Sequence, residues 1–272
     1  MQVYISIDME GVAGIATPNQ VRRGTDDYPA SRLLMTREAS ATVAGAFVGG
    51  AERVVVNDAH GDMANLLPEE LDPRAELVLG SPKVAGSMVE GLDDAFDVAL
   101  FVGYHAAAGA TGGVLAHTYS GGSFYDVRLD GRSVTEAELN AQLAACHGVP
   151  VGLVTGDDKI CAVAGERLPG VRTVAVKQGR SSAVAASLHP EAARAEIRAA
   201  AAEAVGGAAD LVPVGGTPAA IEVDLTTLAK AEVCALVPGA QRVDGRTVRF
   251  AAEPFSELFR CLRAWLYLAA AA

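Results

Sequence analysis

Two acidic side chains stand close together near the start of the chain, where a short β-branched run ends. Asp8 and Glu10 follow the run Val3–Ile7 and precede Gly11. Because side chains alternate along a strand, we expect the two carboxylates to share one face, roughly 7 Å apart. Two carboxylates that face one point are costly to bury unless a cation lies between them. The simpler alternative is a solvated strand end or a helix cap.

Histidines follow two further runs that have the character of strands. His60 comes shortly after Arg53–Asn57, and His105 comes shortly after Val98–Gly103. In open α/β sheets, ligands bind outside the carboxyl ends of the strands, so we expect both histidines to converge with the acidic pair. Imidazole and carboxylate groups together suit zinc and similar divalent ions. The spacing therefore predicts a divalent-metal site.

Two more groups are candidates for the same site. His117 stands in a glycine-rich segment shortly after His105, where a loop can carry it over the metal. Glu136 falls in the first turn of a predicted helix, and Asn140 lies one turn later on the same face. An acidic residue in the first turn also complements the helix dipole, so the position of Glu136 alone does not indicate a ligand.

Strand-like runs alternate with longer alanine-rich segments of helical spacing. This alternation predicts an α/β fold with a mostly parallel sheet and helices on both faces, a Rossmann-like three-layer arrangement. The expected strands are Val3–Ile7, Arg53–Asn57, Glu76–Leu79, Val98–Gly103, Tyr125–Leu129, Val151–Val154 and Val171–Val176, and the expected helices are Ala30–Val48, Val134–Cys146 and Asp157–Arg167. We expect residues 1–178 to form the catalytic core with the metal site. Residues 179–272 should form a smaller C-terminal α+β section, which can still pack as part of the same unit.

Composition narrows the classes of function. The chain has 272 residues, half of them hydrophobic, and a formal net charge of −11. A large folded core is expected, and no basic run is present that would attract nucleic acid or an anionic lipid surface. No bilayer-length apolar stretch and no export signal are visible, so we expect a cytoplasmic protein without membrane partners. The four scattered cysteines favour reduced thiols over disulfides or a zinc ribbon.

Several short motifs, taken together and in order, resemble the signature blocks of the DppA-like D-aminopeptidase family. The matching strings are Ser6-Ile7-Asp8-Met9-Glu10-Gly11, Asn57-Asp58-Ala59-His60, Ser87-Met88-Val89-Glu90-Gly91-Leu92-Asp93, Gly103-Tyr104-His105, Ala116-His117, Glu136 with Leu139-Asn140-Ala141, and Gly156-Asp157-Asp158. The resemblance runs from Met1 to about Gln178 and is loose after Ser181. Members of this family are zinc peptidases that act on short peptides with an N-terminal D-residue.

The resemblance implies two zinc ions per subunit and hydrolysis of the N-terminal peptide bond of substrates such as D-Ala-D-Ala. The ligands that it implies are Asp8, Glu10, His60, His105 and Glu136. It implies His117 as the catalytic histidine, and whether that histidine acts as nucleophile or as general acid/base stays open. Thr135 departs from the pattern, because a glycine is expected before the ligand glutamate. The resemblance also implies a homo-oligomer, a decamer in the family, with the site facing an internal channel.

Other roles and other functions stay open at this level. Asp157 and Asp158 are interpreted as helix-capping acids, or as groups that hold a substrate amine. Lys177 is either a group that holds a carboxylate or oxyanion, or a solvated surface lysine. One alternative function is a two-metal phosphoesterase, because Asp58-Ala59-His60 matches the Asp-x-His of such sites, although no Asn-His pair occurs. Hydrolysis of other small amides and a non-enzymatic metal- or peptide-binding module are further alternatives.

Overall fold

Seven strands form the larger of two sheets, in the order β3-β2-β1-β4-β7-β8-β9. The computed structural model describes all 272 residues. The strands of this sheet are β1 (Gln2–Ile7), β2 (Arg53–Asp58), β3 (Glu76–Val78), β4 (Val98–Tyr104), β7 (Val151–Asp157), β8 (Arg172–Ser181) and β9 (Val184–Ser187). All neighbours are parallel except β8 and β9. The central strands are buried on both sides, which explains their continuous apolar runs.

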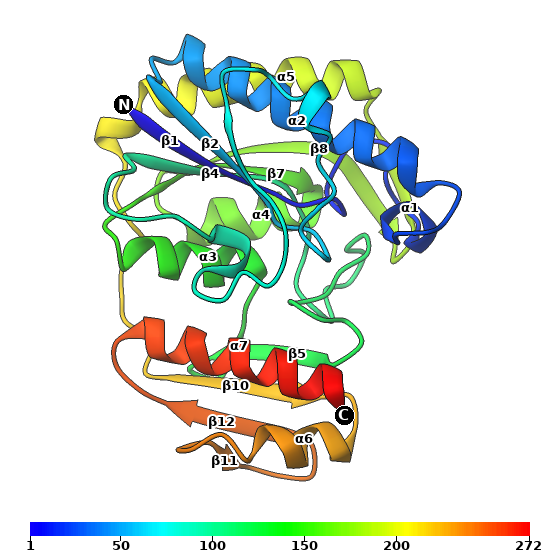
Figure 1. Cartoon of the computed structure of the whole chain (residues 1–272), viewed down its shortest axis with the longest axis vertical. Helices are drawn as coiled ribbons and strands as arrows, with labels where there is room; N and C mark the ends of the chain where they lie inside the picture. Colours follow the sequence, from blue (N-terminus) through cyan, green and yellow to red (C-terminus); the bar gives the residue numbers. More distant parts are fainter.

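Helices cover both faces of this sheet (Figure 1). On one face, α2 (Tyr28–Val48) and α5 (Pro190–Gly206) lie side by side, and on the other lie α3 (Glu136–Ala145) and α4 (Asp158–Arg167). The remaining short helices of the larger unit are α1 (Pro18–Val21), η1 (Pro68–Glu70), η2 (Ser87–Val89) and η3 (Ala208–Asp210). The predicted α/β class, with a mostly parallel sheet between helices, is confirmed.

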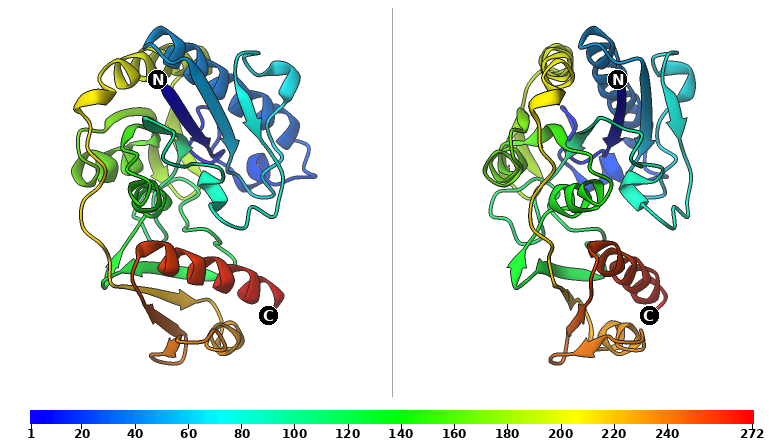
Figure 2. Two further views of the ribbon diagram at one scale, coloured as in Figure 1. Left: turned by 60° about the vertical axis from the view of Figure 1, so that its left-hand side comes forward. Right: turned by 90° about the vertical axis from the view of Figure 1, so that its left-hand side faces the viewer.

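A second, antiparallel sheet lies at the other end of the molecule, in the order β11-β12-β10-β5-β6 (Figures 1 and 2). Its strands are β5 (Phe124–Leu129), β6 (Arg132–Ser133), β10 (Ala220–Leu225), β11 (Gln241–Arg242) and β12 (Thr247–Ala251). Two helices accompany it, α6 (Leu228–Cys234) and α7 (Phe255–Ala271). Because α7 packs against β10 and β12 and also against α3, it joins the smaller unit to the larger one.

The place of β5 corrects one expectation, since this strand does not belong to the parallel sheet. The chain turns at Asp130 and Gly131, whose φ angles of 47° and 81° are both positive, and returns as β6. A two-residue turn of this kind joins antiparallel neighbours, whereas parallel neighbours need a long crossover. The Asp-Gly pair is the sequence signal for this hairpin.

The two sheets also do not divide the chain at residue 178. That boundary falls inside β8, and beyond it α5 still packs on the larger sheet beside α2. The two helices approach closely through glycines of α2, since a Cβ at Gly45 would lie 2.3 Å from the carbonyl oxygen of Arg198. We propose instead that residues 124–133 and 220–272 form the smaller unit and that most of the remaining chain forms the larger one.

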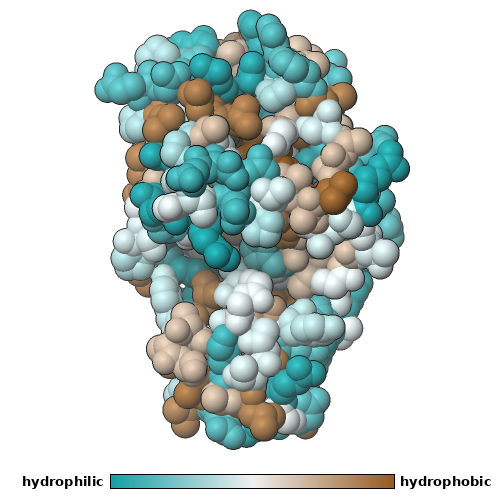
Figure 3. Space-filling model, turned by 90° about the vertical axis from the view of Figure 1, so that its right-hand side faces the viewer, coloured by the Kyte–Doolittle hydropathy of each residue, from teal (hydrophilic) through white to brown (hydrophobic).

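The surface and the cysteines carry little that is unusual. No helix has both the length and the apolar character needed to cross a membrane. On the face shown in Figure 3, hydrophobic residues are interspersed with hydrophilic ones. All four cysteines are free, with Cys146 exposed and the other three buried.

Candidate metal centre

The carboxyl ends of three adjacent strands meet at one edge of the larger sheet. β1 pairs in parallel with β2 on one side and with β4 on the other, so Asp8, His60 and His105, which follow these strands, lie near one another. The backbone after β1 passes very close to the end of β4, because a Cβ at Gly11 would lie 2.0 Å from the carbonyl oxygen of Tyr104. A glycine is therefore required at position 11 for this close approach.

The five ligands and the catalytic histidine that the resemblance implies all gather here, and we call these six side chains the strand-end cluster. One group of potential ligand atoms belongs to Asp8, Glu10 and His60, and a second belongs to His105, His117 and Glu136. Within each group the atoms lie within 4.8 Å of one another. Asp8 connects the groups, because its Oδ1 lies 3.2 Å from Nδ1 of His60 and its Oδ2 lies 3.3 Å from Nε2 of His105.

Each histidine of the cluster has one ring nitrogen within hydrogen-bond distance of a backbone carbonyl. The carbonyls are those of Val21 for Nε2 of His60 (2.8 Å), Ala106 for Nδ1 of His105 (3.0 Å) and Leu115 for Nδ1 of His117 (3.0 Å). A carbonyl can only accept, so each of these nitrogens donates its N–H. The other nitrogen of a neutral ring then has a free lone pair. Such backbone contacts are typical of histidines that bind metals.

The free nitrogen of His105 has no hydrogen-bond partner although it is buried. It lies 3.3 Å from Oδ2 of Asp8 and 3.4 Å from Oε2 of Glu136. A lone pair and two ionised oxygens that face one point repel one another unless a proton or a metal cation lies between them. This unpartnered nitrogen among carboxylates fits a bound divalent ion with mixed nitrogen and oxygen ligands.

The electrostatics of the cluster favour a cation. Burial by itself lowers the pKa of His105, but the charge of Glu136 and the contact with Asp8 outweigh it, and the pKa is raised well above its ordinary value. The pKa of His60 is raised in the same way, by Glu10 and Asp8. Burial by itself raises the pKa of Asp8, yet its contacts with the two histidines lower it. The site therefore combines ionised carboxylates with a strongly negative local field.

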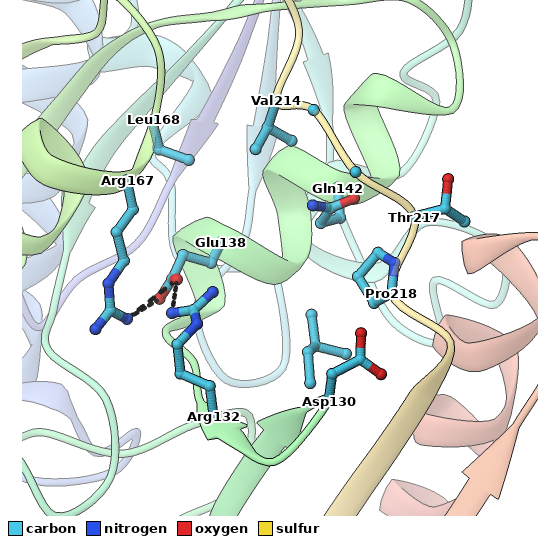
Figure 4. A pocket seen from close by; sticks show the side chains of 12 residues that line it. Asp130, Arg132, Glu138, Gln142, Arg167, Leu168, Val214, Thr217 and Pro218 are labelled. Atoms are coloured by element: carbon cyan, nitrogen blue, oxygen red, sulfur yellow. Dashed lines mark hydrogen bonds and ion pairs between the residues drawn. The ribbon is translucent and has the colours of Figure 1, made fainter.

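A capping box positions Glu136 at the first residue of α3. Thr135 accepts a hydrogen bond from the backbone of Glu138 at 3.1 Å, and the carboxylate of Glu138 accepts one from the backbone of Thr135 at 2.9 Å. Arg132 and Arg167 form ion pairs with Glu138 at 2.6 and 3.2 Å (Figure 4). The threonine in place of the expected glycine thus strengthens the helix start and leaves the carboxylate of Glu136 in the cluster.

His117 is the most accessible member of the cluster. Its side chain is 26% exposed, whereas the other five are at most 10% exposed. Its ring stacks on that of His105, with centroids 4.2 Å apart, and its Nε2 lies 3.7 Å from Oε1 of Glu136. The same glutamate oxygen accepts a hydrogen bond from the backbone of Tyr119 at 2.6 Å. The loop therefore presents a fixed, reachable imidazole nitrogen.

Asp157 and Asp158 have structural roles at the start of α4. Asp157 is the N-cap residue and accepts hydrogen bonds from the backbone of Lys159 and Ile160, as the capping interpretation predicts. Its second oxygen accepts one from the backbone of Val114 at 2.8 Å, which ties the loop of His117 to the helix. Neither aspartate lines the cavity in front of the cluster.

Lys177 is buried, so both expectations for this residue are wrong. Its ammonium group donates hydrogen bonds to the backbone carbonyls of Glu10, of Val12 at 3.0 Å and of Ile15 at 2.6 Å. A lysine has three N–H donors, and these contacts use all of them. Lys177 therefore secures the loop after β1 and has no donor left for a substrate.

A cavity of about 230 Å³ opens in front of the strand-end cluster. Its lining includes three residues of α7, namely Arg263, Leu266 and Tyr267. The site predicted from the sequence lies within residues 1–178 and does not include this wall. One available signal is Arg263 itself, a single charge on the otherwise apolar buried face of α7.

Comparisons with known proteins give the family. The sequence profile of Peptidase M55, described as D-aminopeptidase, matches residues 1–264. A D-aminopeptidase from Bacillus subtilis (strain 168) is 38% identical over 268 residues, which cover 96% of this chain and 95% of that protein. The solved structure of the Zn-dependent D-aminopeptidase DppA from Bacillus subtilis, a self-compartmentalizing protease, is similar with a TM-score of 0.90 and 36% identity, over 100% of this chain and 99% of that one. The chain therefore belongs to the M55 family of D-aminopeptidases.

Proposed function

We propose that this chain is a zinc-dependent D-aminopeptidase that hydrolyses the N-terminal peptide bond of short peptides containing D-residues. The observation that carries the proposal is the unpartnered Nε2 of His105, which lies beside the buried carboxylates of Asp8 and Glu136 that line the cavity. Family membership supports both the reaction and the zinc. The cavity of about 230 Å³ is smaller than the roughly 300–1,000 Å³ typical of sites for drug-sized ligands, which favours a peptide of two or three residues.

We assign two zinc ions to the strand-end cluster. The proposed ligands are Asp8, Glu10, His60, His105 and Glu136. Asp8 would help to hold both ions, because each of its oxygens contacts a different histidine. The backbone contacts of the histidine rings support the assignment, because they leave one nitrogen of each ring free for a metal.

The proposed mechanism divides the work between metal and protein. Bound zinc would polarise the peptide carbonyl and lower the pKa of a coordinated water toward 7. His117 is the proposed proton carrier: its Nδ1 donates to the carbonyl of Leu115, so its Nε2 can accept the proton that the attacking water loses and then pass it to the leaving amine. His117 lines the cavity. Glu136, 3.7 Å away, helps to orient the imidazole.

The alternative of a phosphoesterase finds no support in the geometry of Asp58. The Oδ2 of this residue accepts hydrogen bonds from the backbone of Asn65 at 2.6 Å and of Leu66 at 2.7 Å. Its Oδ1 accepts one from the side chain of Asn65 at 2.8 Å. Asp58 thus organises the loop after β2 and does not form a ligand pair with His60.

We further propose that the protein assembles into a homo-oligomer, a decamer with its sites facing an internal channel, and that it acts on D-peptides in the cytoplasm. The similar structure of a self-compartmentalizing protease supports the assembly. Four free cysteines support a reducing compartment. Sedimentation of the purified protein should give a large single species, and a monomer at micromolar concentration would contradict the assembly.

Metal analysis combined with peptide hydrolysis tests the function. The purified protein should contain stoichiometric zinc and release D-Ala from D-Ala-D-Ala faster than L-Ala from L-Ala-L-Ala. Chelation should abolish the activity, and added zinc should restore it. Activity that survives complete removal of metal would overturn the metal mechanism, and cleavage of L-peptides alone would overturn the proposed specificity. Hydrolysis of p-nitrophenyl phosphate at a comparable rate would favour the phosphoesterase.

A further inference from the structure

Three lysine or arginine side chains are buried in this protein, namely Lys83, Lys177 and Arg263. Each lysine has three acceptors for its three N–H groups: Lys177 has the backbone carbonyls named above, and Lys83 has the side chain of Asn57 and the carbonyls of Asp58 and Val78. All N–H donors of both lysines are therefore satisfied within the protein. Arg263 differs from them.

The guanidinium of Arg263 has donors to spare. Both of its hydrogen bonds come from Nη2, to the carbonyl oxygen of Lys83 at 3.0 Å and to the hydroxyl oxygen of Tyr267 at 2.8 Å. Its Nε is buried and has no partner. No carboxylate lies within 4.0 Å, since Arg263 takes part in none of the ion pairs of the molecule.

A buried cation without an anionic partner is expensive for a protein. The ring of Tyr267 lies 5.0 Å from the guanidinium carbon, and this cation–π contact offsets part of the cost. Arg263 itself is 5% exposed, and the exposed part faces the cavity that it lines. Such an arginine is suited to an anion that enters the cavity.

The charges that line the cavity come from both units of the molecule, the acids from the larger unit and the arginine from α7 of the smaller one. Asp8, Glu10 and Glu136 belong to the strand-end cluster, and Arg263 is the single lysine or arginine in the lining. A short peptide has a similar division, because its free amine and scissile carbonyl lie at one end and its α-carboxylate at the other. In a cavity of about 230 Å³, a dipeptide bound at the cluster would bring its carboxylate toward α7.

We propose that Arg263 binds the free C-terminal carboxylate of the substrate and so restricts the enzyme to very short peptides with an unmodified carboxyl end. The inference rests on the proposed function, because it takes the strand-end cluster as the place where the peptide bond is cleaved. The Nη1 group makes no hydrogen bond within the protein, so it can donate a charge-assisted hydrogen bond to a carboxylate, which adds orientation to attraction. Tyr267 and the carbonyl of Lys83 hold the guanidinium in place for this contact.

Kinetics with D-Ala-D-Ala and its C-terminal amide provide the test. The zinc-loaded enzyme should prefer the free acid by about 10- to 100-fold in kcat/KM, mostly through KM, as expected for hydrogen bonds to a charged group. Arg263→Gln should reduce this preference to near unity. Arg263→Lys should retain part of it, because the charge remains. Zinc content and melting temperature of each variant show whether it folds.

Arg260→Gln is the matched control. Arg260 lies on the same helix, its side chain is 74% exposed and its partner is Glu257. This variant should keep the preference of the wild-type enzyme for the free acid. Its preference would fall only if the general positive charge of α7, and not the buried guanidinium, attracted the substrate.

Two outcomes would overturn the inference. The first is equal cleavage of acid and amide by the wild-type enzyme, which needs no variant to observe. The second is an equal loss on both substrates in Arg263→Gln. If the wild-type enzyme cleaves neither peptide, the proposed function fails separately. Calorimetry can then measure the binding of the acid and of the amide to the wild-type protein and to Arg263→Gln. If Arg263 binds the carboxylate, the wild-type protein should bind the acid more tightly than the amide, and the variant should not.

Discussion

The two walls of the cavity are built in different ways. One wall consists of side chains at the ends of adjacent strands of the parallel sheet, and its members contact one another within a few ångströms. The other wall is a single helix, α7, which packs on the antiparallel sheet of the smaller unit. The proposed metal chemistry thus lies on side chains of the larger unit that contact one another, whereas the proposed recognition of substrate lies on a helix of the smaller unit.

Among substitutions in the first wall, loss of the buried imidazole of His105 should reduce activity the most. His105→Ala removes a proposed ligand and leaves Asp8 and Glu136 facing each other. We expect zinc content to fall and kcat/KM for D-Ala-D-Ala to drop by about 10³-fold or more, because the metal activates the water. Metal analysis and peptide hydrolysis measure both. His147→Ala, at an exposed histidine after α3, is the control and should resemble wild type.

The partly exposed imidazole of His117, in the same wall, should behave differently. His117→Ala should retain zinc but lose about 10²- to 10⁴-fold in kcat, the usual contribution of general acid–base catalysis. A parallel measurement of bound zinc separates this outcome from that of His105→Ala. Loss of zinc to the same extent in both variants would show that His117 is a ligand and not a proton carrier.

A substitution in α7, which forms the second wall, should first lower the stability of the protein. Trp265 of α7 is fully buried and donates a hydrogen bond to the carbonyl of Cys234 at 2.9 Å. Trp265→Ala should lower the free energy of unfolding by about 3–5 kcal/mol. Among molecules that remain folded, KM should rise while zinc stays bound. Urea denaturation checks the first expectation, and Tyr125→Ala, at a side chain that is 65% exposed, should change stability by less than about 0.5 kcal/mol.

A buried acid in the larger unit should make the free energy of unfolding depend on pH. Burial raises the pKa of Glu38 from 4.5 to about 7. The folded protein keeps this proton up to about pH 7, whereas the unfolded chain releases it near pH 4.5, so the free energy of unfolding should fall as pH rises through that interval. The decline should be at most about 3 kcal/mol.

Glu38→Gln should remove this decline, because glutamine has no proton to lose. Urea denaturation at pH 5 and pH 7 measures it. Glu52→Gln changes an acid whose side chain is 85% exposed and should leave the decline intact. An equal pH dependence in wild type and Glu38→Gln would mean that other groups control it.

The first wall could be predicted from the sequence because its information is local. The central strands are continuous apolar runs, and Asp8, His60 and His105 directly follow three of them, so the parallel topology alone brings them together. The Thr135 cap and the Asp157 cap are likewise local signals.

The second wall could not be predicted because its position depends on contacts between distant residues. No periodicity in α7 indicates which cavity the helix covers, and Arg263 carries no motif. The role of Lys177 could not be predicted for a related reason, since a lysine that follows an apolar run gives the same sequence pattern whether it is solvated or buried. The hairpin at Asp130 and Gly131 had a local signal, but the alternation of strands and helices suggested a parallel neighbour.

The strand order of the smaller sheet affects how the chain folds during its synthesis on the ribosome. β5 pairs with β10, and Arg128 and Glu222 on these strands are 94 residues apart. At typical rates of synthesis, β5 waits on the order of 5–20 s for its partner. During that time the apolar face of its hairpin has no cover. Helix α7, which lines the cavity, is made later still, so a nascent chain would have the proposed metal ligands well before the proposed carboxylate-binding arginine.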